Sequence, residues 1–136
     1  MEESIRSAFA LPEQDVRSFS PLALAYLGDS VYELVLRTCV VEKGNRQVKL
    51  MDREGSNLAK AETQARMAAA LQDILTDEES AAYRRGRNTN SSSVAKHASV
   101  LDYRQATGLE SLFGYLYLTG REERIFELVR KGWENI

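Results

Sequence analysis

The chain has 136 residues, the size of one domain that can bury an ordinary core, so we expect a single domain over residues 1–136. One cysteine excludes an internal disulfide, and one histidine excludes paired-histidine catalysis and the usual zinc sites. The formal net charge of −2 argues against a uniformly basic nucleic-acid-binding protein and directs attention to where the charges lie.

The first element is an N-terminal lead-in over residues 1–19, predicted to be a short helix or an extended segment. It carries Glu2 and Glu3 where a secretory signal would carry positive charge. No apolar run in the sequence is long enough to span a membrane. We therefore expect a cytoplasmic protein without membrane contact.

A long helix is predicted to begin at Ser20 and Pro21, because serine caps free backbone N–H groups and proline suits the first helical position. The segment to Val41 is apolar on nearly every face. This pattern is typical of a central helix or of one that meets a second subunit. Cys39 is expected to be a small core residue.

Two residues inside this helix do not fit a plain core pattern. Gly28 indicates the close approach of another backbone, because glycine costs a helix about 1 kcal/mol relative to alanine. Asp29 is a carboxylate among apolar residues, so it must be paired, hydrogen-bonded or bound to a metal.

A turn containing Gly44 is expected to end the long helix. Apolar residues then recur at helical spacing over residues 51–75, where Gly55 and Ser56 are expected to divide the pattern into two helices. Thr76 and Glu79 form a capping box that predicts the start of another short helix.

This short helix is expected to end near Gly86, before the polar loop 88–93. Ser99 caps the next apolar helix, which stops at Gly120, and a final amphipathic helix covers residues 122–135. No segment alternates apolar and polar residues as a half-buried strand would. The predicted fold class is all-α.

The helix that follows Ser99 carries a second acid and glycine, Glu110 and Gly114. Two helices that cross at glycines bring their backbones together, so Asp29 and Glu110 would face each other. Paired carboxylates repel unless a cation lies between them, and Mg²⁺ takes such oxygen ligands.

The alternative is that the two acids are unrelated. Asp29 would then pair with Arg37 or Arg104, and Glu110 would point to solvent. Glu33, one turn beyond Asp29, is expected to pair with Arg37.

The segments that carry the two acids resemble two motifs of the ribonuclease III family. Residues 24–31, LAYLGDSV, are similar to the signature helix, and residues 107–114, TGLESLFG, are similar to the second acidic motif. With the sequence RRGRN at residues 84–88 and no double-stranded-RNA-binding domain after these motifs, the chain most resembles Mini-ribonuclease III.

The resemblance implies an all-helical endonuclease domain that works as a homodimer and binds Mg²⁺, or Mn²⁺ as a substitute, in a valley for double-stranded RNA. It implies Asp29 and Glu110 as catalytic and metal-binding residues and Tyr26 as a dimer contact. Products would carry 5′-phosphates and 3′-hydroxyls. The implied substrate is the large-subunit (23S) ribosomal RNA precursor, with a ribosomal protein as an assisting partner.

The chain departs from the family pattern at three acidic positions, which are occupied here by Leu22, Ala25 and Thr107. The expected metal site is therefore poorer, with compensation by other acids left open. The candidates for compensation are Asp52, Glu62 and Asp102. The departures motivate an alternative function, a non-cleaving RNA-binding domain that docks on ribosomal precursors. A third possible function is a helical dimer that binds only protein.

RNA contacts are expected from a basic segment in an otherwise acidic chain. Its basic side chains would contact phosphates, and its amide groups would reach 2′-hydroxyls. The predicted RNA-binding residues are Arg84, Arg85, Arg87, Asn88, Lys96 and Arg104.

Overall fold

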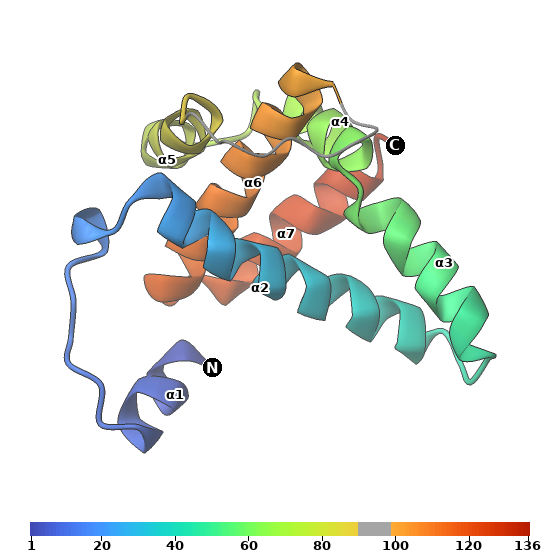
Figure 1. Cartoon of the computed structure of the whole chain (residues 1–136), viewed down its shortest axis with the longest axis horizontal. Helices are drawn as coiled ribbons and strands as arrows, with labels where there is room; N and C mark the ends of the chain where they lie inside the picture. Colours follow the sequence, from blue (N-terminus) through green and yellow to red (C-terminus); the bar gives the residue numbers. More distant parts are fainter. Residues whose placement is uncertain (90–98) are drawn as a thin grey trace.

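The computed structural model describes residues 1–89 and 99–136, and these residues contain helices and no strand, which confirms the all-α prediction (Figure 1). The elements in chain order are α1 (Glu2–Ala8), η1 (Val16–Ser18), α2 (Pro21–Glu42), α3 (Val48–Ala59), α4 (Ala61–Leu71), α5 (Asp77–Arg87), α6 (Val100–Leu118) and α7 (Glu122–Trp133). Within these ranges, no helix combines the length and apolar character that a membrane crossing requires.

The crossing of α2 and α6 forms the centre of the fold (Figure 1). A Cβ atom at Gly28 of α2 would lie 1.7 Å from the backbone oxygen of Glu110, and one at Gly114 of α6 would lie 2.0 Å from the backbone oxygen of Leu24. Each glycine therefore admits the backbone of the other helix. The predicted close approach of these two helices is confirmed.

The core is organised around Tyr32, which is fully buried on α2. Its ring stacks on Phe113 of α6 with the ring centroids 5.8 Å apart. Its hydroxyl donates to the backbone oxygen of Leu58 at 2.7 Å and accepts from Trp133 Nε1 at 3.1 Å. One side chain thus ties together α2, α3, α6 and α7.

The predicted helix starts are confirmed by cap geometry. The side chain of Ser20 accepts from Ala23 N, and that of Ser99 accepts from Asp102 N. Thr76 and Glu79 make both hydrogen bonds of the capping box.

The predicted break at Gly55 and Ser56 is wrong. The chain leaves the helix at Lys60, whose backbone is extended with φ −66° and ψ 151°. Gly55 stays inside α3, where a Cβ would have only ordinary contact with Leu36, at 3.4 Å. Glycine flexibility at Gly55 therefore does not set the break.

The prediction for Cys39 is also wrong, because the residue is exposed. It lines a groove between α2 and α7 together with Leu34 and Phe126. The apolar surface of α2 therefore reaches solvent along one side, as a helix that meets a second subunit would.

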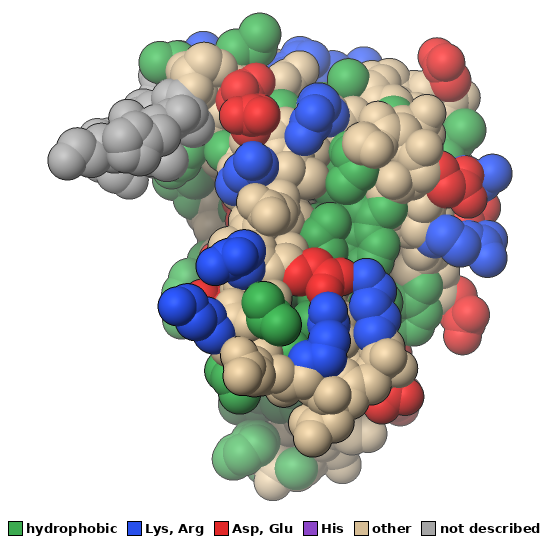
Figure 2. Space-filling view, turned by 90° about the vertical axis from the view of Figure 1, so that its right-hand side faces the viewer, with side chains coloured by type: hydrophobic (Ala, Val, Ile, Leu, Met, Phe, Trp, Pro, Cys, Tyr) green, Lys and Arg blue, Asp and Glu red, His purple; other side chains and the backbone are tan. Residues whose placement is uncertain are grey.

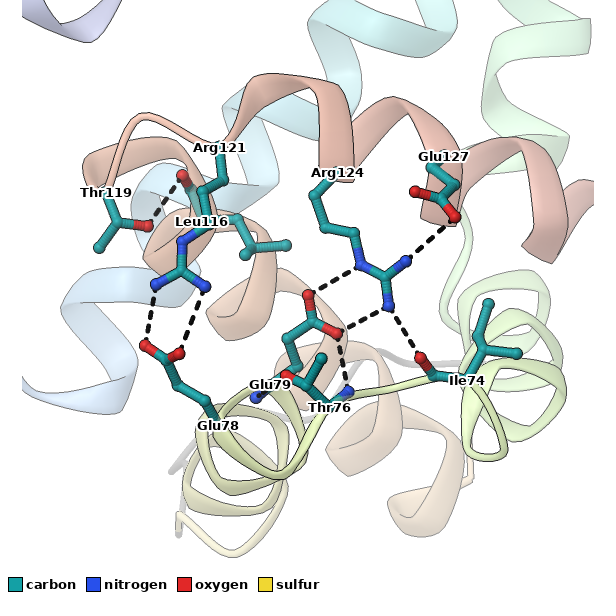
Figure 3. A network of polar contacts seen from close by, with 9 residues as sticks. All are labelled: Ile74, Thr76, Glu78, Glu79, Leu116, Thr119, Arg121, Arg124 and Glu127. Atoms are coloured by element: carbon teal, nitrogen blue, oxygen red, sulfur yellow. Dashed lines mark hydrogen bonds and ion pairs between the residues drawn. The ribbon is translucent and has the colours of Figure 1, made fainter.

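A network of ion pairs fastens α5 to α7 (Figure 3). Glu79 is 2 % exposed and accepts from Arg124 Nε and Nη2 at 2.8 and 2.9 Å. Arg124 also donates to the backbone oxygen of Ile74 at 2.8 Å. Burial alone would raise the pKa of Glu79, but hydrogen bonds from Arg124 and from the backbone of Thr76 outweigh it and hold the pKa below its ordinary value.

Candidate active site

Asp29 and Glu110 lie together at the helix crossing. The backbone of Glu110 packs against Gly28, the residue before Asp29, and the two carboxyl groups share a hydrogen bond. Asp29 is exposed and Glu110 is half-buried, so the pair opens toward solvent. The expectation that Asp29 is surrounded by apolar core is wrong, because this side of α2 is not covered.

The carboxyl pair holds a proton. Burial is the largest cause that raises the pKa of Glu110, from its ordinary 4.5 to about 9; the hydrogen bond with Asp29 and its charge add to the shift, and a hydrogen bond with Gln64 opposes it. The raised pKa favours the protonated form of Glu110 at pH 7, and a protonated carboxyl can donate a hydrogen bond to Asp29.

The alternative pairing of Asp29 with Arg37 is not observed. Arg37 Nε donates to Glu33 at 2.9 Å, as predicted for Glu33, so Arg37 does not neutralise Asp29. Glu110 does not point freely to solvent.

The donor set fits a hard divalent cation held by two carboxylates and water. The charge of Asp29 raises the pKa of Glu110, and a cation between the two carboxyl groups would relieve the same repulsion. Mg²⁺ commonly binds through one or two carboxylates while keeping several waters. In the described ranges, no three His, Cys, Asp or Glu residues gather into a metal-binding group. The site therefore supplies at most two acids per chain from residues 1–89 and 99–136.

None of the three acids considered for compensation adds a third ligand there. Asp52 lines a hollow between α2 and α3 with Glu33 and Arg37, and Glu62 is exposed on α4. Asp102 lies two turns before Glu110 on α6. Compensation by these three acids is therefore not observed.

Gln64, a buried residue of α4 whose amide contacts Glu110, was not among the predicted site residues. The alanine-rich segment around Gln64 predicts a closely packed helix and gives no sign that this amide has a role in the site. The one available signal was a lone amide among the apolar residues of an inner helix face.

The basic segment begins on the last turn of α5. A Cβ at Gly86 would lie 3.0 Å from Gly108 Cα, so α5 packs closely against α6 two residues before Glu110, on a different face of that helix. This packing leaves Arg84 and Arg85 exposed on α5.

The other predicted RNA-binding residues differ in how exposed they are. Arg87 is half-buried, with its guanidinium 5.7 Å from the centre of the Tyr83 ring and its Nε donating to Asn88 Oδ1 at 3.2 Å. Arg104 is exposed on the first turns of α6. Lys96 lies outside the described residues.

On the face toward α3, positively and negatively charged side chains are mixed (Figure 2). Lys and Arg side chains there lie among Asp and Glu side chains rather than forming a surface of one sign. Lys43 and Arg46, for example, both form ion pairs with Glu54. This face does not have the one-signed charge of an RNA-binding surface.

A family model described as the ribonuclease III domain matches residues 22–121, which include both acids and the basic segment. The chain belongs to the ribonuclease III family. Two similar relatives are both named Mini-ribonuclease 3. The protein from Clostridium tetani is 40 % identical over 119 residues, covering 87 % of this chain and 79 % of the relative. The protein from a Thermoanaerobacter species is 44 % identical over 115 residues, covering 85 % of this chain and 81 % of the relative.

A solved structure supports the same assignment of fold. The crystal structure of protein FN1578 from Fusobacterium nucleatum matches with a TM-score of 0.79 and 26 % identity, covering 87 % of this chain and 94 % of that one. The resemblance to Mini-ribonuclease III is thus confirmed, and the chain is a double-strand-specific endoribonuclease of the ribonuclease III family.

Proposed function

We propose that this ribonuclease III family member hydrolyses double-stranded RNA with Mg²⁺ held by Asp29 and Glu110, and that it matures the ends of the 23S ribosomal RNA precursor. The observation that carries the proposal is the carboxyl pair itself, which lies at a solvent-facing helix crossing where burial and the neighbouring acid raise the pKa of Glu110. Hydrolysis would leave a 5′-phosphate and a 3′-hydroxyl.

The two acids have different parts in binding the cation. Asp29 is exposed and accepts the hydrogen bond from Glu110, so it is the first group that an arriving cation meets. Glu110 must release its proton to become a ligand, because metal ligands bind in their deprotonated form. When bound, Mg²⁺ polarises a phosphoryl oxygen and activates water for in-line attack.

RNA would be held by positive charge on α5 and on the first turns of α6. Arg84, Arg85 and Arg104 are exposed cations that suit phosphate contacts, and Asn88 suits a 2′-hydroxyl. Lys96 stays a predicted contact. With few such groups, binding should be modest and should weaken steeply with salt, by about one unit of log K per log unit of salt for each phosphate contacted.

A homodimer is part of the proposal. On α2, Tyr26 is 84 % exposed and Leu34 is 51 % exposed. Leu34 also lines the groove of about 660 Å³ between α2 and α7, whose walls are almost wholly apolar. A second copy of the chain would cover this surface, with Tyr26 as a contact, and would bring a second acid pair to the same RNA.

A non-cleaving RNA-binding domain is the second candidate. It is favoured because no three acids gather into a metal-binding group within the described ranges. Incubation of the purified chain with duplex RNA and Mg²⁺ separates the two candidates. A cytoplasmic location, Mn²⁺ as a substitute metal and an assisting ribosomal protein stay predictions.

The direct test of the proposed function is Asp29→Asn, which removes the ionised acid and keeps its shape. We expect the variant to fold and to bind duplex RNA in EDTA, and to lose cleavage by at least about 100-fold, because the cation loses its exposed carboxylate. Glu42→Gln, an exposed acid at the far end of α2, is the matched control and should cleave normally. Cleavage retained in Asp29→Asn would overturn the assignment.

A further inference from the structure

Gln64 is a polar residue on the inner face of α4, where core packing alone would favour an apolar side chain. It is 3 % exposed, and the neighbouring Ala65, Met67 and Ala68 are also buried. A buried amide that lacks partners costs about 1–3 kcal/mol. Its place among apolar residues therefore calls for a specific use of its hydrogen-bonding groups.

The junction of α3 and α4 sets the orientation of this amide. Nε2 of Gln64 donates to the backbone oxygen of Ala59 at 2.8 Å. Ala59 ends α3, and the last carbonyls of a helix lack partners within their own helix. A hydrogen bond with Gln64 also lowers the pKa of Glu110 against the larger raising effect of burial. Because only a donor favours the ionised form of a carboxyl group, this contact is assigned to the nitrogen end of the amide.

The other end of the amide has no partner. Oε1 of Gln64 is buried and accepts no hydrogen bond from any part of the chain that the structure describes. It belongs to the same planar amide as the nitrogen that contacts Glu110, so it lies beside the acid pair. A water molecule bound to a cation is a strong donor, and Mg²⁺ usually keeps several waters.

We propose that Gln64 is a positioning residue for the acid pair: its Nε2 holds the Glu110 carboxylate in place, and its Oε1 accepts a hydrogen bond from a water that hydrates the bound cation. The proposal rests on the metal-dependent function proposed above. Gln64 acts through Glu110 and bound water and does not touch the reacting phosphate. Partners of this kind typically change metal affinity by 10- to 100-fold, on the order of the effect expected here.

The test is Mn²⁺ binding by Gln64→Met, which removes both amide groups and keeps an unbranched side chain. We expect about tenfold weaker binding, measured from the electron paramagnetic resonance signal of free Mn²⁺ without RNA and well below the melting temperature. Gln72→Met is the matched control, because Gln72 also donates to a backbone oxygen, that of Ala68 at 2.8 Å, but is exposed. It should bind Mn²⁺ as the unmodified chain does.

Duplex RNA binding in EDTA should be unchanged in Gln64→Met, which separates positioning from a general loss of structure. If Gln64→Met does not fold, Gln64→Asn keeps the amide but withdraws it by one methylene, and it should show the same loss of Mn²⁺ affinity. An affinity within about twofold of the unmodified chain in the folded variant would overturn the proposal. An unmodified chain that binds Mn²⁺ but does not cut RNA would contradict the proposed function and not the role of Gln64.

Discussion

At the scale of single residues, Glu110 joins the packing of the fold to its chemistry. Its backbone oxygen occupies the space that a side chain at Gly28 would fill, and its carboxyl group meets the carboxylate of Asp29. The contact that fixes the crossing of the helices therefore also fixes the distance between the acids. Burial then makes one of the two acids neutral until a cation replaces its proton.

The proton on Glu110 predicts how stability depends on pH. Because its pKa rises from 4.5 to about 9 on folding, the folded chain binds this proton more tightly than the unfolded chain. Without metal, this proton contributes its full amount to the free energy of unfolding below pH 4.5, and the contribution is lost as the pH rises toward 9. Glu110→Gln cannot lose a proton, so its stability should fall less over this range.

Urea unfolding in EDTA at about pH 6 and about pH 9 measures this difference. The unmodified chain should lose more stability between the two conditions than Glu110→Gln does. Glu42→Gln, which changes an exposed acid on α2, should behave as the unmodified chain. Equal losses in the unmodified chain and Glu110→Gln would contradict the assignment of the proton to Glu110.

At the scale of elements, the crossing of α2 and α6 and the fastening of α5 to α7 hold the site in place. The crossing of α2 and α6 depends on glycines, which leave room for the backbone of the other helix. The contact between α5 and α7 depends on a buried ion pair. These two devices respond differently to mutation because the first is limited by backbone atoms and the second by the cost of an unpaired charge.

Gly28→Ala should strongly destabilise the fold. Its Cβ would lie 1.7 Å from a backbone oxygen of α6, which cannot move away as a side chain would, so we expect a loss of about 3 kcal/mol or more. Gly55→Ala is the matched control, because its Cβ would meet only Leu36 Cδ1, at 3.4 Å. It should leave stability unchanged or raise it by up to about 1 kcal/mol through helix propensity. Thermal and urea unfolding measure both.

Arg124→Met should destabilise the contact between α5 and α7. It leaves Glu79 buried without its charged partner, which typically costs about 3–5 kcal/mol; we expect about 3 because Arg124 itself is 22 % exposed. Arg37→Met removes an exposed pair with Glu33 and should not change the unfolding midpoint measurably. A similar small effect in both variants would show that the buried pair does not stabilise the fold.

At the scale of the whole molecule, the exposed apolar surface of α2 and its groove with α7 remain without a partner within the described chain. α1 buries none of its own residues, although the amino group of Met1 forms an ion pair with Glu122 of α7 at 2.7 Å. The proposed dimer would use this side of the molecule. The acid pair is complete within one chain, so dimerisation is expected to serve RNA binding rather than metal binding.

Leu34→Glu should therefore convert a dimer into a monomer, because it places a charge on the wall of the apolar groove. Sedimentation analysis measures the mass, and Mn²⁺ affinity should stay unchanged. Leu50→Glu introduces the same charge at a leucine of α3 that is 45 % exposed, outside the groove, and should leave the mass unchanged. A dimer in both variants would exclude this surface as the interface.

The sequence by itself determined the helical class, most helix boundaries and the two acids. Ser20, the Thr76 capping box and Ser99 act within one turn of the backbone, so their effects follow from local spacing. The glycines at positions 28 and 114 also predicted the crossing, because a glycine inside an apolar helix has few other reasons to be there.

Only the tertiary structure decided which groups are exposed, charged or paired. The break at Lys60, the exposure of Cys39 and Asp29, the proton on Glu110 and the contact with Gln64 all depend on helices distant in the sequence. Burial and hydrogen bonding are set by neighbours from several elements at once, and no local pattern of residues contains that information.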